Sequence, residues 1–146
     1  TVINFDGDEV RNFFGDSLSF DSCDRKRVVS TLVHLTNKAT SSGINVIVSA
    51  LTANEDAREL VRETVSGLIS GYVKCPVEIC AERDPKGLYA QAKNNEIDTL
   101  IGINSEYLPP ESPDIIIDTS ELLPPQAIDY IVEFLRRTEK ISETVL

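Results

Sequence analysis

Apolar residues along this 146-residue chain follow two periodicities, and the change from one to the other predicts the order of strands and helices. Apolar or β-branched runs at residues 2–5, 45–50, 72–75 and 114–118 indicate strands. The middle two are typical of a parallel sheet that is covered on both faces. Elsewhere apolar residues recur at the three- and four-residue spacing of amphipathic helices. The order β-α-α-β-α-β-α-long connection-β-α predicts an α/β, three-layer domain with a mostly parallel sheet.

Capping residues predict where the first two helices begin and end. Asp8 is expected to cap a short helix that extends through Phe14. Asp21 or Ser22 is expected to cap a longer helix, and Gly43 suits the left-handed position that ends it.

Similar signals divide the rest of the chain. Residues 52–55, Thr-Ala-Asn-Glu, match a capping box and predict a third helix that runs to about Ile69. Pro76 opens a fourth helix, and Pro124 opens the last one. Residues 84–113 are polar and are interrupted by glycines and prolines. This segment is too long for a simple connection, and we expect it to be a mobile lid.

Composition and charge narrow the class of protein. The net charge of −10 argues against non-specific binding to nucleic acid or anionic membranes, although a local basic cluster can still bind a nucleotide. No apolar run is long enough to span a membrane, and no basic-then-apolar leader precedes the first strand. The chain has three cysteines, Cys23, Cys75 and Cys80, and their spacing is not that of metal ligands. An odd number of cysteines is expected of reduced thiols rather than of a set of disulfides. We therefore expect a cytoplasmic protein without nucleic-acid or membrane partners.

The sharpest chemical pattern is Asp6-Gly7-Asp8 at the end of the first strand, followed by Arg11. Ligands in parallel α/β sheets bind at such strand ends. The two carboxylates can hold a hydrated Mg²⁺ or accept a hydroxyl proton, and Arg11 can bind an anion through both guanidinium nitrogens. Gly7 would let the backbone approach a ligand closely. A helix cap with a salt bridge between Asp8 and Arg11 explains the same residues equally well.

Two further residues have both a functional and a structural interpretation. Lys86 stands beside a glycine in the expected lid, where it can swing onto a phosphate, but an exposed turn explains it as well. Phe20 precedes the expected cap at Asp21 and can stack on a base or simply pack in the core.

In this order, these segments resemble the adenylylsulfate (APS) kinase family over nearly the whole chain. Residues 6–11, Asp-Gly-Asp-Glu-Val-Arg, are similar to the family's Asp-Gly-Asp-Asn-Val/Ile-Arg motif, and residues 18–25 resemble its Leu-Gly-Phe-Ser-x-x-Asp-Arg segment. Residues 80–89 are nearly the family's lid signature, residues 96–114 continue that lid in register, and residues 117–119 match the end of its last strand. Such a long ordered match is more specific than any single motif.

The resemblance implies a P-loop kinase fold and a defined reaction. The γ-phosphoryl group of MgATP is transferred to the 3′-hydroxyl of APS, giving PAPS (3′-phosphoadenylylsulfate) in sulfate assimilation. ATP and Mg²⁺ would be the cofactors, and APS the nucleotide substrate. The family also implies a homodimer and leaves open a fusion to, or an association with, a sulfurylase.

The resemblance also assigns roles to residues near the transferred phosphoryl group. Asp8 would orient and deprotonate the 3′-hydroxyl, and Asp6 would support Mg²⁺ through water. Lys86 would close onto the substrates with the lid. Cys80 would lie near the ATP adenine, and Arg83 is placed in the same ATP-binding region.

At the acceptor, the resemblance implies that Arg11 and Arg25 bind the phosphosulfate and that Phe20 stacks on the adenine. Leu51 and Thr52 would line the same pocket.

Three departures from the family's pattern converge on this acceptor pocket. Val28 stands where relatives carry a substrate-binding Asn, and Leu100 stands where they carry a base-stacking Phe. Residues 52–54 read Thr-Ala-Asn in place of Ser-Pro-Tyr. This pattern indicates retained phosphoryl transfer with weaker or altered acceptor recognition.

The family's first strand and its Gly-x-x-Gly-x-Gly-Lys-Ser/Thr loop do not occur in residues 1–146, which we take as one APS kinase-like domain lacking that segment. We expect a strand from an upstream segment or another chain to lie between the strands at 45–50 and 72–75, because unpaired strand edges inside a core would orphan buried backbone groups. Three functions remain open: an APS kinase, a kinase of another nucleotide-linked acceptor, and a non-catalytic nucleotide-binding domain without a P-loop.

Overall fold

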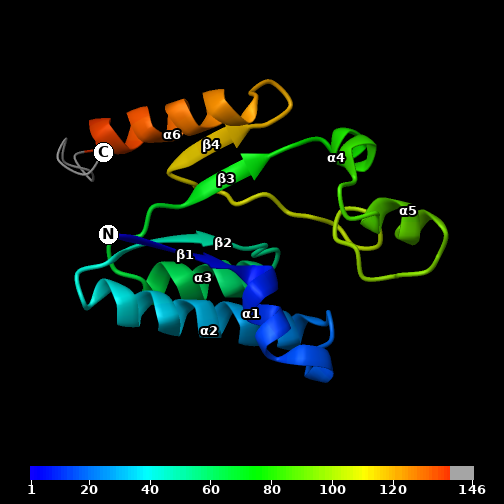
Figure 1. Ribbon diagram of the computed structural model, residues 1–146. Coiled ribbons are helices and arrows are strands. Elements are labelled where there is room, and N and C mark those ends of the chain that lie inside the picture. Colours follow the sequence, from blue (N-terminus) through cyan, green and yellow to red (C-terminus); the bar gives the residue numbers. More distant parts are fainter. Residues whose placement is uncertain (139–146) are drawn as a thin grey trace. The chain divides into compact units, whose positions relative to one another are not determined.

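The computed structural model describes residues 1–138, and these form two compact units, Thr1–Leu68 and residues 69–138 (Figure 1). Each unit contains a two-stranded parallel sheet and helices that pack against it. The predicted α/β class is therefore confirmed, and all four predicted strands are present.

The first unit is built on strands β1 (Val2–Asp6) and β2 (Asn45–Ser49), which pair in parallel register from Val2 opposite Asn45 to Asp6 opposite Ser49. Both strands therefore end at the same level, and the segments that follow them emerge side by side. The helical elements of this unit are α1 (Gly7–Phe13), the short 3-10 helix η1 (Gly15–Ser17), α2 (Ser22–Thr40) and α3 (Glu55–Thr64).

Asp6, and not Asp8, caps helix α1, so that prediction is wrong. Asp6 has extended backbone angles, and its Oδ1 accepts a hydrogen bond of 2.8 Å from the backbone N–H of Asp8. Strand β1 extends to Asp6, so Gly7 is already helical. The predictions for α2 are confirmed, since Asp21 accepts from the N–H of Asp24 and Gly43 has a φ of 77°.

The capping-box prediction for α3 is also wrong. Asn54 is the N-cap, without a hydrogen bond from its side chain, and the helix ends at Thr64 rather than near Ile69. The carboxylate of Glu55 binds Arg58 and Arg62 along the helix, so this side chain is engaged away from the N-terminus.

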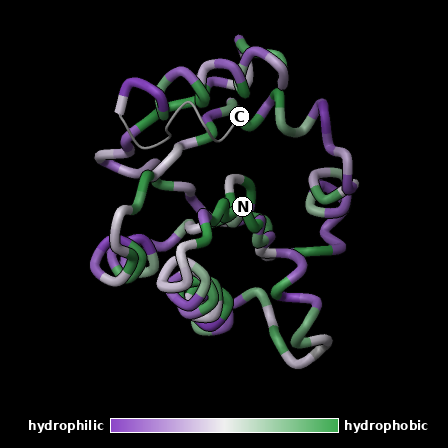
Figure 2. Tube along the Cα trace, turned by 60° about the vertical axis from the view of Figure 1, so that its left-hand side comes forward, coloured by the Kyte–Doolittle hydropathy of each residue, from purple (hydrophilic) through white to green (hydrophobic). Residues whose placement is uncertain are grey.

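Helix α2 provides most of the buried residues of the first unit. Val28 and Leu32 pack with Val10 and Leu18, and Phe5 from β1 lies against this cluster. The neighbouring residues of α2 pack toward α3 in a second cluster of Val29, Val33 and Ala57. Hydrophobic and hydrophilic residues are interleaved along the helical turns (Figure 2), as amphipathic helices require. Two hydrophobic clusters thus hold α2 in place, one on the side of α1 and the other on the side of α3.

The second unit is built on strands β3 (Gly71–Lys74) and β4 (Ile115–Asp118), which pair in parallel with Tyr72 opposite Ile116. Its helices are α4 (Val77–Arg83), α5 (Leu88–Lys93) and α6 (Pro124–Arg137). The helices predicted to follow Pro76 and to start at Pro124 are therefore confirmed. Helix α5 lies within the segment 84–113, which is less irregular than its sequence indicated.

The middle strands are more exposed than their apolar sequences predicted. Ile47 and Val48 of β2 are 57% and 42% exposed, and Val73 of β3 is 64% exposed. The reason is the small size of each sheet: among the described residues, β2 pairs only with β1, and β3 only with β4. Direct pairing of β2 with β3, which would contradict an intervening strand, does not occur there, and the intervening strand stays a prediction. Within residues 1–138, no helix has the length and apolar character to cross a membrane.

Candidate functional site

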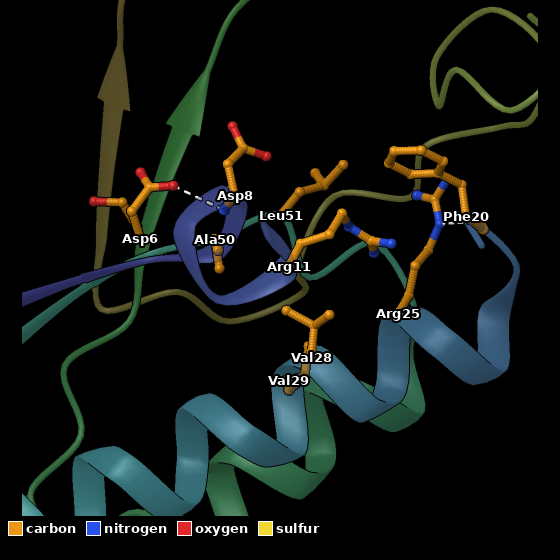
Figure 3. A pocket seen from close by; sticks show the side chains of 11 residues that line it. Asp6, Asp8, Arg11, Phe20, Arg25, Val28, Val29, Ala50 and Leu51 are labelled. Carbon is orange, nitrogen blue, oxygen red and sulfur yellow. Dashed lines mark hydrogen bonds between the residues drawn. The ribbon is translucent and has the colours of Figure 1, made fainter. Parts of the chain in front are cut away.

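A pocket of about 330 Å³ opens in the first unit where β1 and β2 end (Figure 3). Strand ends, the start of α1 and the first half of α2 enclose it, and the same edge of a parallel sheet is where ligands generally bind. Its lining residues are Asp6, Gly7, Asp8, Arg11, Phe20, Arg25, Val28, Val29, Ser49, Ala50 and Leu51. Six residues that the sequence assigned to the site, from Asp6 to Leu51, therefore come together here.

Two carboxylates lie at the start of α1. Asp6 is held by the hydrogen bond from the N–H of Asp8, whereas the Asp8 side chain projects from the first turn of α1 and is exposed (Figure 3). The cap is thus Asp6 and not the predicted Asp8, while the predicted carboxylate pair is present because both groups line the pocket.

Gly7 is required by a contact within the protein. A Cβ atom at this position would lie 3.1 Å from the Cβ of Ala50, which is tighter than ordinary van der Waals contact. The turn from β1 into α1 therefore approaches the end of β2 closely only because residue 7 has no side chain. The sequence-based interpretation placed this close approach at a ligand, and the contact with Ala50 was not visible in the local pattern.

Arg11 turns away from the start of its helix toward the segment that precedes α2. Its Nη1 donates a hydrogen bond of 2.6 Å to the carbonyl of Ser19, and its guanidinium carbon lies 4.4 Å from the centre of the Phe20 ring. Phe20 is 55% exposed, so the core-packing alternative for this residue is wrong. A cation over one face of an exposed ring leaves an aromatic surface for a planar ligand.

Arg25 reaches the same segment from the first turns of α2. Its Nε donates to the carbonyl of Phe20 over 2.6 Å (Figure 3). Burial, and then the positive charge of Arg11, lower the pKa of Arg25 from its ordinary value. Because two like charges face each other in a partly buried site, binding an anion there relieves their repulsion.

The remaining wall of the pocket is apolar. Val28 and Val29 are 7% and 4% exposed and also belong to the two core clusters beneath α2. Leu51 completes the wall from the segment after β2, and the pocket lining ends there. Thr52 lies just beyond, and its carbonyl accepts a hydrogen bond of 2.7 Å from Nε of the buried Arg58. Sequence reasoning missed Arg58, whose one visible signal was its place in the first turn of α3.

The other predicted site residues belong to the second unit. Arg83 donates to the carbonyl of Thr119 over 2.6 Å and to the Cys75 sulfur over 3.8 Å, which ties α4 to the end of β4. Burial and a hydrogen bond with Cys75 raise the pKa of Cys80. Leu100 is half-buried, and its N–H donates to Asn104.

Lys86 lies in an ordered turn between α4 and α5. Asp84 has a φ of 20°, which is rare outside glycine, and its carboxylate accepts hydrogen bonds from the N–H groups of Tyr89 and Ala90. Gly87 has a φ of 69°, in the left-handed region. The turn presents the exposed side chain of Lys86, so the sequence-based description of an exposed turn holds locally.

The donor set for a metal ion is small. Among residues 1–138, no group of three or more His, Cys, Asp or Glu side chains is arranged to hold a metal. Asp6 and Asp8 supply two carboxylates in the pocket. This suits Mg²⁺, which keeps several waters and binds through one or two carboxylates together with substrate phosphates.

Comparison with known proteins identifies the family. The family model described as adenylylsulphate kinase matches residues 1–118. The chain is similar to a probable adenylyl-sulfate kinase of Bacillus subtilis, with 33% identity over 138 residues, covering 93% of this chain and 70% of that protein. A probable adenylyl-sulfate kinase of Archaeoglobus fulgidus is 35% identical over 114 residues, covering 78% of this chain and 74% of that protein.

A solved structure gives the same result. The APS kinase of Mycobacterium tuberculosis, determined in complex with AMPPNP and APS, matches with a TM-score of 0.80 and 31% identity, covering 91% of this chain and 79% of that chain. This match confirms the predicted P-loop kinase fold. The family model, the curated relatives and the solved structure together establish that this chain belongs to the adenylylsulphate kinase family of phosphotransferases.

Proposed function

We propose that this protein transfers the γ-phosphoryl group of MgATP to the 3′-hydroxyl of APS, giving PAPS for sulfate assimilation. The observation that carries the proposal is one pocket with opposite chemistry at its two ends. Two carboxylates stand at the start of α1, and two guanidinium groups converge on the Ser19–Phe20 segment. The anionic group of a nucleotide would match the guanidinium groups, and its reactive hydroxyl would match the carboxylates.

Arg11 and Arg25 would bind the phosphosulfate. Each guanidinium donates a hydrogen bond to a backbone carbonyl, which helps to fix its direction. Burial and the nearby charge of Arg11 lower the pKa of Arg25, and a bound anion would offset both effects. Phe20 would stack on the adenine through the ring face opposite Arg11, a contact worth about 1–3 kcal/mol per base.

Asp8 would act on the 3′-hydroxyl of the acceptor. Its carboxylate is exposed to the pocket, and a positioned general base of this kind typically contributes about 10²–10⁴-fold to the rate. Asp6, held in place by the Asp8 N–H, would support a hydrated Mg²⁺ through water, and the ion would neutralise charge on the ATP phosphates.

Residues of the second unit would contact both the donor and the acceptor nucleotide. Lys86 on its exposed turn would reach a phosphate as the lid formed by residues 84–113 closes, and Leu100 in the same lid would contact the acceptor base. Cys80 and Arg83, both on α4, would lie at the ATP base. We also propose that the protein forms a homodimer, either by itself or fused to or associated with a sulfurylase.

One observation favours a second candidate, a kinase of another nucleotide-linked acceptor. Val28 lines the pocket and is buried, so this wall offers no hydrogen bond where the family pattern carries an Asn. The family match itself favours APS.

Acceptor selectivity tests the proposal. The full-length protein is incubated with γ-labelled ATP, Mg²⁺ and either APS, AMP or adenosine, and labelled products are separated. We expect transfer to APS at a kcat/KM at least about tenfold above that for AMP, because the sulfate adds contacts with the guanidinium groups. Preferential labelling of another nucleotide would establish the second candidate, and no transfer to any acceptor would support a non-catalytic domain.

A further inference from the structure

The Ser19–Phe20 segment connects the two cationic side chains of the pocket. The carbonyl of Ser19 accepts the hydrogen bond from Arg11, and the next carbonyl, that of Phe20, accepts the one from Arg25. The Phe20 ring also lies under the Arg11 guanidinium. The directions of two cations and one ring therefore depend on the conformation of two consecutive residues.

The Asp24 carboxylate holds the first residue of this segment. Its Oδ2 accepts hydrogen bonds from the backbone N–H of Ser19, over 2.7 Å, and from the Ser19 hydroxyl, over 2.9 Å. The hydroxyl oxygen in turn accepts a bond of 3.2 Å from the N–H of Asp21. These bonds reach back five residues and close the segment into a ring.

The Asp24 carboxylate is suited to this clamp. Its side chain is only 16% exposed. The hydrogen bonds from Ser19 lower the pKa of Asp24, and its place in the first turn of α2 also favours a negative charge. Arg27 binds the other carboxylate oxygen over 3.3 Å from an exposed position.

Capping of α2 does not explain this arrangement. The cap is Asp21, whose Oδ1 accepts from the backbone N–H of Asp24 over 2.8 Å. The Asp24 side chain points out of the helix toward Ser19, so the helix would keep its cap without it.

We infer that Asp24 is a positioning residue for the acceptor site, which clamps Ser19 so that the carbonyls of residues 19 and 20 aim Arg11 and Arg25 at one anion. The inference rests on the proposed function only for the identity of that anion as the phosphosulfate of APS. Asp24 itself lies outside the pocket lining and acts through the segment that it holds.

The test compares Asp24→Ala with Arg27→Ala in the full-length protein. Both changes remove the Asp24–Arg27 ion pair, but only the first removes the clamp on Ser19. We expect Asp24→Ala to raise the KM for APS about tenfold, since hydrogen bonds to charged groups are lost, with kcat and the KM for ATP unchanged within about twofold. Arg27→Ala should leave all three unchanged. A smaller rise in KM is expected for Ser19→Ala, which removes only the hydroxyl bond.

A second measurement does not depend on the substrate. In ¹⁵N-resolved NMR spectra of the unliganded protein, the Ser19 amide and the Arg25 Nε–H should lose protection from solvent exchange in Asp24→Ala and keep it in Arg27→Ala. Retained protection of Arg25 in Asp24→Ala would overturn the inference, as would an unchanged KM for APS with only a lower melting temperature. If the NMR signals change but the wild type does not phosphorylate APS, the clamp stands and the proposed function fails.

Discussion

The two units of this protein share a plan but differ in how much of it is buried. In the first, α2 buries four apolar residues between neighbouring helices and strand β1. In the second, α6 is more strongly amphipathic in sequence than α2, yet none of its described residues is buried. Ile115 and Ile117 of β4, with Ala92 of α5, supply the buried apolar residues there. The comparison teaches that most of the side chains proposed to bind the acceptor, Leu100 excepted, belong to the better-packed unit.

The largest effect that we expect is a loss of catalytic rate from a substitution in the first unit. In the full-length protein, Asp8→Asn should reduce kcat by about 10²–10⁴-fold, because the amide cannot take the hydroxyl proton. Steady-state phosphoryl transfer to APS measures this, and circular dichroism should show an unchanged fold. Glu9→Gln, one residue along α1 and also exposed, is the matched control. Near-normal turnover by the Asp8 variant would remove Asp8 from the mechanism.

The packing difference itself predicts unequal losses of stability. Leu32→Ala in α2, where the side chain is 3% exposed, should lower the free energy of unfolding by about 2–5 kcal/mol. Ile128→Ala in α6, where the side chain is 60% exposed, should change it by less than about 0.5 kcal/mol. Urea denaturation of each variant measures both. Equal losses would show that α6 is buried to the same extent as α2 in solution.

A substitution at Leu100 tests whether the second unit contributes to acceptor binding. Leu100→Phe should restore a base-stacking ring and tighten APS binding by about 1–3 kcal/mol. Calorimetric titration with APS measures the gain, and Leu108→Phe, at an exposed leucine of the same segment, is the control. Weaker or unchanged affinity would place residue 100 outside the acceptor pocket.

The smallest expected effect concerns pH. Lys74 and Ser120 lower the pKa of Asp118 to about 2. A carboxylate whose pKa is lower in the folded state stabilises the protein above its unfolded pKa, near 3.9, and this contribution is lost as pH falls toward 2. The melting temperatures of wild type and Asp118→Asn should therefore differ at pH 6 and converge near pH 2. A constant difference over that range would contradict this account.

Local signals predicted the secondary structure well. The strands, the cap at Asp21 and the turn at Gly43 follow from periodicity and from hydrogen bonds within a few residues. The errors at α1 and α3 arose where several residues could cap, since Asp6 and Asp8, or Thr52 and Asn54, offer similar groups. Only the course of the backbone selects between such neighbours.

The sequence by itself determined the residue types of the site and the family to which they belong, because the ordered motifs are carried by the chain. Tertiary structure alone decided that Arg11 turns to Ser19 and Phe20, and that Gly7 accommodates Ala50. The physical reason is distance along the chain. Capping and periodicity act within one or two turns, whereas these contacts join segments that meet only after β1, β2 and α2 have packed together.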